Sequence, residues 1–151
     1  MAIYYWKKSL SVGIDEIDSQ HKQLIEYINQ LHNIIEGNKG KNDFNNVFNA
    51  LFEYTKNHFS LEEKLMEKYN YSLFNAHKSA HDTFSNEVER FYSEYLNGKS
   101  VEMKLVSFLG TWLVTHIAKD DKDYCTFMKP VVEKESNSNW YKSLVNKIWK
   151  N

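Results

Sequence analysis

The sequence has few residues that break a helix and almost none that cross-link a chain. Its 151 residues include a single proline, Pro130, and only five glycines, so long helices are favoured over a β fold with many turns. The single cysteine, Cys125, excludes an intrachain disulfide, a zinc site built from several thiolates and an iron–sulfur cluster. Any metal would have to be held by histidine and carboxylate side chains.

An excess of charge of one sign and long apolar runs are also missing. The formal net charge is −1 and neither sign dominates a segment, so nucleic acid is not expected as a partner. No run approaches the roughly 20 apolar residues of a membrane span, and the N-terminal stretch lacks the continuous apolar segment of a signal peptide. We expect a cytoplasmic monomer without integral membrane association.

Apolar residues recur at steps of three and four in four successive stretches, which predicts an all-α fold with four amphipathic helices. Each stretch opens with a residue suited to cap a helix. The predicted starts are Asp18, Asn42 or Asp43, Ser72 and Ser100, and the predicted ends are Gly37, the turn 69–72, Asn97 and the region after His116. Short connections favour an up-down-up-down four-helix bundle.

The two ends of the chain differ from these helices. Residues 1–17 are rich in aromatic and β-branched side chains without a helical period, which predicts an extended arm packed across the bundle. We expect residues 1–130 to form the bundle domain and residues 131–151 a C-terminal extension. Apolar residues spaced among lysines, such as Trp140, Leu144 and Val145, predict a short amphipathic helix there. It is expected to dock on the bundle, with membrane-surface contact or dimerisation as alternatives.

Five of the six histidines lie on the apolar stripes of these helices. They are His21, His58, His77, His81 and His116. His58 with Glu62, and His77 with His81, are pairs four residues apart, which places the members of each pair on one face of a helix. In the predicted bundle the starts of the first and third helices lie beside the ends of the second and fourth. The five histidines are therefore expected in one layer.

This layer is too polar for an ordinary protein core. An uncompensated buried polar group costs several kcal/mol, and a shared cation would compensate all of them. Imidazole and carboxylate without thiolate suit iron, zinc, copper or manganese. A mononuclear zinc site takes three or four protein ligands. This layer offers seven, namely the five histidines, Glu62 and an aspartate at position 120 or 121, which favours two bridged metals. His32 lies about 16 Å further along its helix than His21 and is assigned a structural role.

The fourth helix leaves the choice of aspartate open. Asp120 follows His116 by four residues and shares its face on a regular helix, whereas Asp121 is rotated by about 140°. Helical spacing therefore favours Asp120. One turn away from the histidines, Leu24, Ile25, Trp112 and Leu113 are apolar, and we expect them to form core and to line a dry pocket.

Over about residues 5–128 the chain resembles the hemerythrin family, in particular its single-domain bacterial members. The stretch VGIDEIDSQH is similar to the family's approach to its first ligand. Seven residues carry the resemblance, in the family's order and spacing: His21, HxxxE from His58 to Glu62, HxxxH from His77 to His81, and HxxxxD from His116 to Asp121. The resemblance selects Asp121, which requires the helix to end or distort there.

The resemblance implies two non-haem iron ions, Fe2+ or Fe3+, joined by an oxo or hydroxo bridge. The implied ligands are His77, His81 and His116 for one iron, His21 and His58 for the other, and Glu62 and Asp121 as bridging carboxylates. It further implies reversible O2 binding for storage, delivery or scavenging, and no enzymatic role. The alternatives are an O2 or redox sensor acting through the bundle surface or tail, a di-iron peroxidase or nitric oxide-reactive protein, a zinc protein, or a purely structural bundle.

Overall fold

A computed structural model describes residues 3–37 and 40–149 of the chain. The helices are α1 (Asp15–Glu36), α2 (Lys41–Lys68), α3 (Phe74–Leu96), α4 (Glu102–His116), α5 (Lys122–Glu135) and α6 (Asn139–Trp149). A 3-10 helix, η1 (Lys8–Leu10), precedes α1, and a π-helical segment, η2 (Ile117–Asp121), joins α4 to α5. No strand occurs within the described residues. The predicted all-α fold is confirmed.

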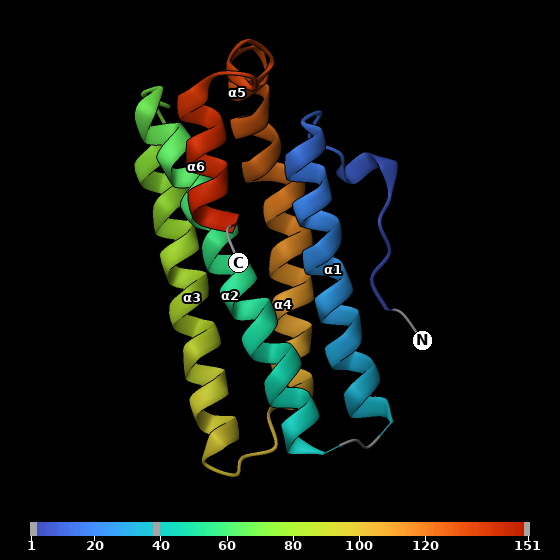
Figure 1. Cartoon of the computed structure of the whole chain (residues 1–151). Helices are drawn as coiled ribbons and strands as arrows, with labels where there is room; N and C mark the ends of the chain where they lie inside the picture. The colour runs from blue at the N-terminus through green and yellow to red at the C-terminus, as the bar shows by residue number, and fades with distance from the viewer. Residues whose placement is uncertain (1–2, 38–39, 150–151) are drawn as a thin grey trace.

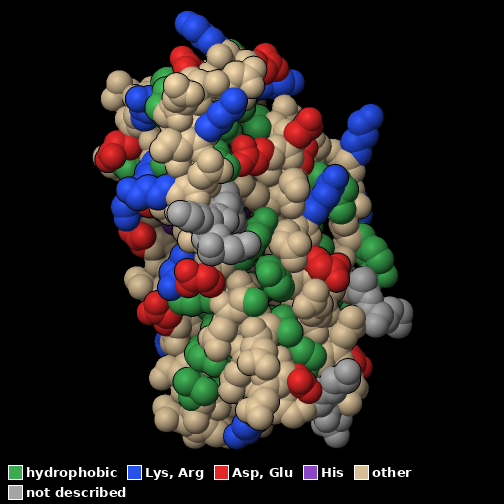
Figure 2. All heavy atoms as spheres, viewed as in Figure 1, with side chains coloured by type: hydrophobic (Ala, Val, Ile, Leu, Met, Phe, Trp, Pro, Cys, Tyr) green, Lys and Arg blue, Asp and Glu red, His purple; other side chains and the backbone are tan. Residues whose placement is uncertain are grey.

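The first four helices form an up-down-up-down bundle (Figure 1). α1 packs against α2 and α4, and α3 packs against the same two helices, so side chains from all four meet along the axis. The core between them is aliphatic and aromatic, with Leu31, Leu51, Leu105 and Val88 at or below 1% exposure. On the face in Figure 2, acidic and basic side chains are interspersed and histidine is almost wholly covered. Among the described helices, none is long and apolar enough to cross a membrane.

The chain reverses direction through two turns of the same kind. After α2, Asn70 adopts a left-handed conformation with φ 55°, and the Tyr71 N–H donates to the Met66 carbonyl at 2.9 Å. After α3, Gly98 has φ 90° and the Lys99 N–H donates to the Glu94 carbonyl at 3.0 Å. These bonds satisfy carbonyls that a helix end would otherwise leave unpaired. The first turn returns α3 beside α2, as the break at residues 69–72 predicts.

The N-terminal arm is held by two polar side chains of α1. The Asn29 side chain accepts hydrogen bonds from the Ile3 and Tyr4 N–H groups at 3.1 and 3.0 Å and donates to the Tyr4 carbonyl at 2.8 Å. Further along, the Asp18 carboxylate accepts from the Ser11 hydroxyl at 2.5 Å and the Val12 N–H at 2.8 Å. The arm is therefore fastened at both ends. Of the arm expected over residues 1–17, residues 1 and 2 lie outside the described part, residues 8–10 form η1 and residues 15–17 already belong to α1.

The predicted caps Asp18, Ser72 and Ser100 were wrong, whereas α2 begins at Lys41, next to the start expected near Asn42 or Asp43. α1 begins at Asp15 rather than after Asp18, because the Asp18 carboxylate binds the arm instead of a helix terminus. α3 and α4 begin after Leu73 and Val101, and no side chain caps either helix. At α3 the Phe74 N–H donates to the Tyr71 carbonyl at 3.0 Å, so the preceding turn satisfies a donor that a Ser72 cap would have served.

The described C-terminal part of the chain, up to residue 149, is helical. α5 runs continuously across residue 130, with Pro130 inside it, so the domain division expected there stays a prediction. α6 packs against α2. The Tyr141 hydroxyl donates to Glu16 of α1 at 2.8 Å, and the Lys68 ammonium lies 4.5 Å from the centre of the Trp140 ring. The amphipathic helix thus contacts two bundle helices near the end where α5 also lies (Figure 1).

A glycine in α4 makes room for the arm. A Cβ on Gly110 would overlap the Tyr4 ring, whereas a Cβ on Gly40 would meet nothing within 4 Å. Alanine in a helix interior gains about 1 kcal/mol over glycine, but overpacking a close contact costs about 1–3 kcal/mol. We expect Gly110→Ala to lower the free energy of unfolding in urea and to expose the arm to proteases.

Gly40→Ala is the control for the arm, and it should leave the protease resistance of the arm unchanged. It should lower the free energy of unfolding slightly, because glycine is preferred to alanine at the helix N-cap that Gly40 occupies. Adding Tyr4→Ala removes the overlap, so the double variant Tyr4→Ala/Gly110→Ala should be no less stable than Tyr4→Ala alone. Equal stability of Gly110→Ala and the parent would mean that the ring does not rest on this glycine.

Candidate metal centre

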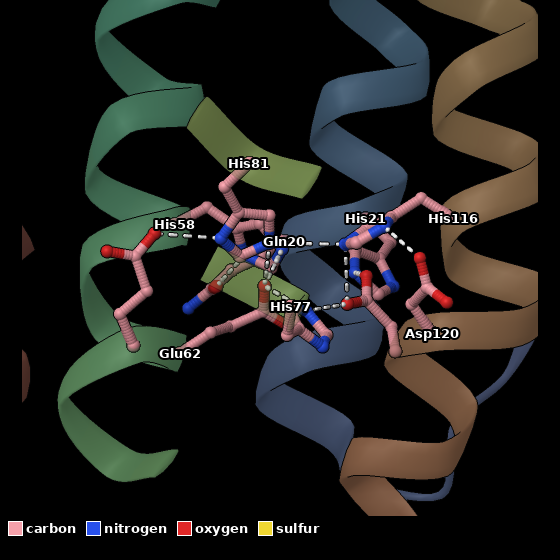
Figure 3. A network of polar contacts seen from close by, with 10 residues as sticks. Gln20, His21, His58, Glu62, His77, His81, His116 and Asp120 are labelled. Atoms are coloured by element: carbon pink, nitrogen blue, oxygen red, sulfur yellow. Dashed lines mark hydrogen bonds and ion pairs between the residues drawn. The ribbon is translucent and has the colours of Figure 1, made fainter. Parts of the chain in front are cut away.

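The bundle brings seven titratable side chains into one buried layer (Figure 3). α1, α2, α3 and α4 supply the five histidines of the layer, α2 also supplies Glu62, and η2 supplies Asp121. All seven are at or below 4% exposure. They are His21, His58, Glu62, His77, His81, His116 and Asp121, the residues expected from the sequence.

Ligand atoms in the layer form two overlapping groups, each able to hold one cation. Within each group these atoms all lie within 4.8 Å of one another. The three-imidazole group contains His77, His81 and His116, and the two-imidazole group contains His21 and His58. Glu62 and Asp121 belong to both groups. The layer therefore offers two adjacent sites joined by two carboxylates.

Asp121 divides its two oxygens between these groups. Its Oδ1 lies 3.0 Å from the Nε2 atoms of His77 and His116, and its Oδ2 lies 3.0 Å from Nε2 of His21. Glu62 approaches both groups through Oε1, 3.5 Å from Nε2 of His58 and 3.4 Å from Nε2 of His81. The Asp121 arrangement is that of a carboxylate able to bridge two cations.

The π-helical segment explains why Asp121 rather than Asp120 enters the layer. A π segment hydrogen-bonds i to i+5, so it takes more residues to complete a turn than an α-helix does. Five residues after His116, Asp121 therefore comes back to the face of His116 and is 1% exposed. Asp120 contacts the outer nitrogen of the same ring, with Oδ2 3.0 Å from Nδ1. The helix distorts here but does not end.

Many polar atoms facing the layer have no hydrogen bond. Among the described residues they include Nε2 of three histidines and all four oxygens of the two carboxylates: His21, His58, His77, Glu62 and Asp121. Nε2 of His81 and Nε2 of His116 face each other at 3.1 Å. Buried polar atoms are normally paired, and a cation would give these lone pairs a common partner. The donor set fits a divalent metal of the iron, zinc or manganese kind.

Electrostatics within the layer also favour a positive ion. Burial raises the pKa of Glu62 well above its ordinary value, and the nearby Asp121 carboxylate adds to the rise. Burial lowers the pKa of His58 well below its usual range, and the neighbouring His21 adds to the fall. Burial alone would raise the pKa of Asp121, but its interactions with neighbouring histidines, above all His116, outweigh that effect. They hold the pKa of its carboxyl well below the ordinary value. A cation would let both carboxylates ionise while the imidazoles stay neutral.

Three further side chains orient the imidazoles from outside. Oε1 of Gln20 lies 2.5 Å from Nδ1 of His58, and Oε2 of Glu63 lies 2.8 Å from Nδ1 of His81. Asp120 serves His116 in the same way. Helical spacing did not predict these roles, although each partner is the chain neighbour of a predicted ligand. Adjacent helical residues point about 100° apart, so the chain neighbour of a ligand can reach the outer nitrogen of another ring. That ring lies on the next helix for Gln20 and Glu63, and four residues earlier in the chain for Asp120.

Large apolar groups pack around the rings. Phe59 stacks on His81 with ring centres 3.7 Å apart, and Trp112 stacks on His116 at 4.3 Å. Beyond them lies a cavity of about 10 Å³, lined by apolar side chains and Thr55, and its lining includes Leu24, Trp112 and Leu113. Of the four residues expected to line a pocket, Ile25 is buried but does not line this one.

Two residues lie outside the cluster, as expected. Nε2 of His32 contacts Glu36 of its own helix at 3.4 Å, and His32 belongs to neither ligand group. Cys125 is a free, fully buried thiol. Burial raises the pKa of its thiol, so the reactive thiolate form is disfavoured.

Most of the chain matches proteins of one known family. The family model for the hemerythrin HHE cation binding domain matches residues 12–127. A bacteriohemerythrin from Pseudomonas aeruginosa is 35% identical over 144 residues, which cover 93% of this chain and 94% of the relative. A bacteriohemerythrin from Stenotrophomonas maltophilia is 34% identical over 129 residues, covering 85% and 84%.

Solved structures agree with the sequence comparison. A crystal structure of a hemerythrin point mutant superimposes with a TM-score of 0.76 at 29% identity. The match covers 83% of this chain and 97% of that one.

Because so many buried polar atoms of the layer lack partners, we expect the stability of the fold to depend on a bound cation. We expect removal of metal with a chelator to lower the melting temperature and ferrous ion under anaerobic conditions to restore it. A ligand at 100 times its dissociation constant stabilises by about 2.7 kcal/mol, which corresponds to roughly 5–10 °C for a chain of this length. Calcium is the control, because this ion prefers all-oxygen sites and should restore little.

A ferrous effect no larger than that of calcium would mean that the histidine layer is not the metal site.

The two aspartates should respond differently to the loss of charge. Asp121→Asn removes one of the two carboxylates that both groups share, the one that divides its two oxygens between them, so we expect loss of bound metal. Asp120→Asn keeps the layer intact and changes only the partner of His116, so we expect metal affinity to fall by about 10–100-fold, the usual effect of an outer partner. Metal titration of the two purified variants distinguishes them, and equal losses would contradict the assignment of their roles.

Proposed function

This chain belongs to the hemerythrin HHE cation binding family, and from that premise we propose that its buried layer holds two non-haem iron ions and binds O2 reversibly. The observation that carries the proposal is the unequal division of imidazoles. One group of ligand atoms has three and the other has two, while both share Glu62 and Asp121. A cation in the two-imidazole group is thus one protein ligand short and can accept an external molecule.

We propose the seven residues of the layer as the iron ligands. His77, His81 and His116 would hold one ion, His21 and His58 the other, with Glu62 and Asp121 bridging beside an oxo or hydroxo group. When bound, two ferrous ions would supply the two electrons that O2 accepts on binding and returns on release. Glu62 and Asp121 hold the two sites together, and the outer partners keep each Nε2 directed at the layer.

The charge of the ligand set supports a carrier in preference to an enzyme. Two ferrous ions bring four positive charges, and two carboxylates with one hydroxide remove three of them. Di-iron sites of the ferritin-like kind have four glutamates and are more anionic, so they better stabilise highly oxidised iron. Neutral imidazoles favour holding O2 over cleaving it.

Apolar packing around the site supports reversibility. Phe59 and Trp112 cover two of the imidazoles, and the cavity beyond them is lined largely by hydrocarbon. Such a space stays dry, and the absence of water limits the proton transfers that would release reduced oxygen and leave the iron oxidised. The monomeric state and the cytoplasmic location stay predictions.

Metal analysis followed by oxygenation tests the function. We expect two irons per chain, and a visible absorption band that forms when O2 is added to the reduced protein and disappears on deoxygenation. His77→Ala should lose iron and the band. His32→Ala is the control, because His32 is a buried histidine outside the layer, and it should retain both.

Iron that oxidises once without reversal would instead favour the enzymatic or sensor alternatives. A single zinc, or no metal after anaerobic ferrous reconstitution, would overturn the di-iron assignment.

A further inference from the structure

The outer hydrogen-bond partners of the imidazoles differ in charge between the two ligand groups. In the three-imidazole group the acceptors are carboxylates, Glu63 at 2.8 Å from His81 and Asp120 at 3.0 Å from His116. In the two-imidazole group the acceptor is the Gln20 amide, 2.5 Å from Nδ1 of His58. The asymmetry is one of charge, since all three acceptors are oxygens.

The other imidazole of the two-imidazole group extends this asymmetry. Nδ1 of His21 is buried and has no hydrogen-bond partner among the described residues. Neither His21 nor His58 therefore has a carboxylate on its outer nitrogen. The group that is one protein ligand short is also the group without outer anionic charge.

The type of acceptor affects the electron density of the ring. With Nε2 directed at a metal, Nδ1 carries the proton and donates it to the outer partner. A carboxylate acceptor draws that proton toward itself and makes the imidazole a stronger donor to the metal. A neutral amide oxygen fixes the ring orientation without contributing charge, because charge-assisted hydrogen bonds are about twice as strong as neutral ones.

We propose that Gln20 is a positioning residue that keeps the iron held by His21 and His58 the less electron-rich of the pair. Glu63 and Asp120 make the imidazoles of the other iron stronger donors, and these stabilise its ferric state more. The iron that faces the external ligand is then the more readily returned to the ferrous state, which favours release of O2 over permanent oxidation. This inference rests on the proposed di-iron function.

Burial explains why the amide is placed where it is. Gln20 is 5% exposed, whereas the side chains of Glu63 and Asp120 are 21% and 42% exposed. A carboxylate at position 20 would add a third buried negative charge to those of Glu62 and Asp121. Solvent would not screen it, as it partly screens Glu63 and Asp120. Glutamine gives the same reach and the same acceptor without that charge.

Glutamine and glutamate have nearly the same shape, so exchanging them tests charge alone. We expect Gln20→Glu to lower the midpoint potential of the loaded protein and Glu63→Gln to raise it, as followed by spectroelectrochemistry. A tenfold change in the one-electron equilibrium corresponds to about 59 mV, and outer partners commonly change affinity by about 10–100-fold. Gln20→Glu should also autoxidise faster than the parent.

A purely structural role predicts another pattern. If the partners only hold the rings in place, both exchanges should lower iron content or shift the potential in the same direction, and either result would overturn the proposal. Gln20→Ala separates the two roles, because it should lose iron affinity that Gln20→Glu retains. Unchanged potentials in variants that still bind two irons would also overturn it.

A second measurement does not require iron. In the zinc-loaded protein, the Nδ1 protons of His81 and His116 should resonate further downfield than that of His58. Gln20→Glu should move the His58 signal downfield, and Glu63→Gln should move the His81 signal upfield. A parent that fails to bind two irons would refute the proposed function, whereas unmoved proton signals would refute the role of Gln20.

Discussion

The burial of two carboxylates among five imidazoles is the constraint on which the structure depends. Glu62 and Asp121 are 0% and 1% exposed, and charge in such a place must be compensated. Compensation requires that every bundle helix bring a histidine to the same height, from its start in α1 and α3 and from near its end in α2 and α4. The turns, the arm and the aliphatic core keep the four helices in the register that places the histidines at one level along the bundle axis.

The departure from regular helix after His116 serves the same constraint. In an α-helix Asp120 would face the layer and Asp121 would point aside. The π segment reverses this, and it gives each aspartate a different nitrogen of one ring: Asp121 approaches Nε2 and Asp120 approaches Nδ1. One local irregularity thus supplies both the bridging carboxylate and an outer partner. π-bulges within α-helices often coincide with functional sites for this kind of reason.

Local spacing and bundle topology were enough to predict the layer. His58 with Glu62 and His77 with His81 share helix faces, and the alternation of helix direction brings the four ends together. Asp121 could not be found from spacing, because a π segment has no simple sequence signal, and only the family resemblance selected it. The prediction of a helix cap at Asp18 was wrong because the Asp18 carboxylate makes a tertiary contact with the arm. The role of Gln20 depends on which helix lies beside α1, which periodicity does not reveal.

Three neighbouring pairs in the chain, Gln20-His21, Glu62-Glu63 and Asp120-Asp121, each place one member in the layer and the other against a ring from a different position in the chain. For the first two pairs the ring lies on another helix, so sliding α1 or α2 along its axis by one residue would break both contacts together. The polar layer therefore fixes the axial register of neighbouring helices. Aliphatic packing alone would tolerate small axial slips, and here the register is fixed by chemistry at one end of the bundle.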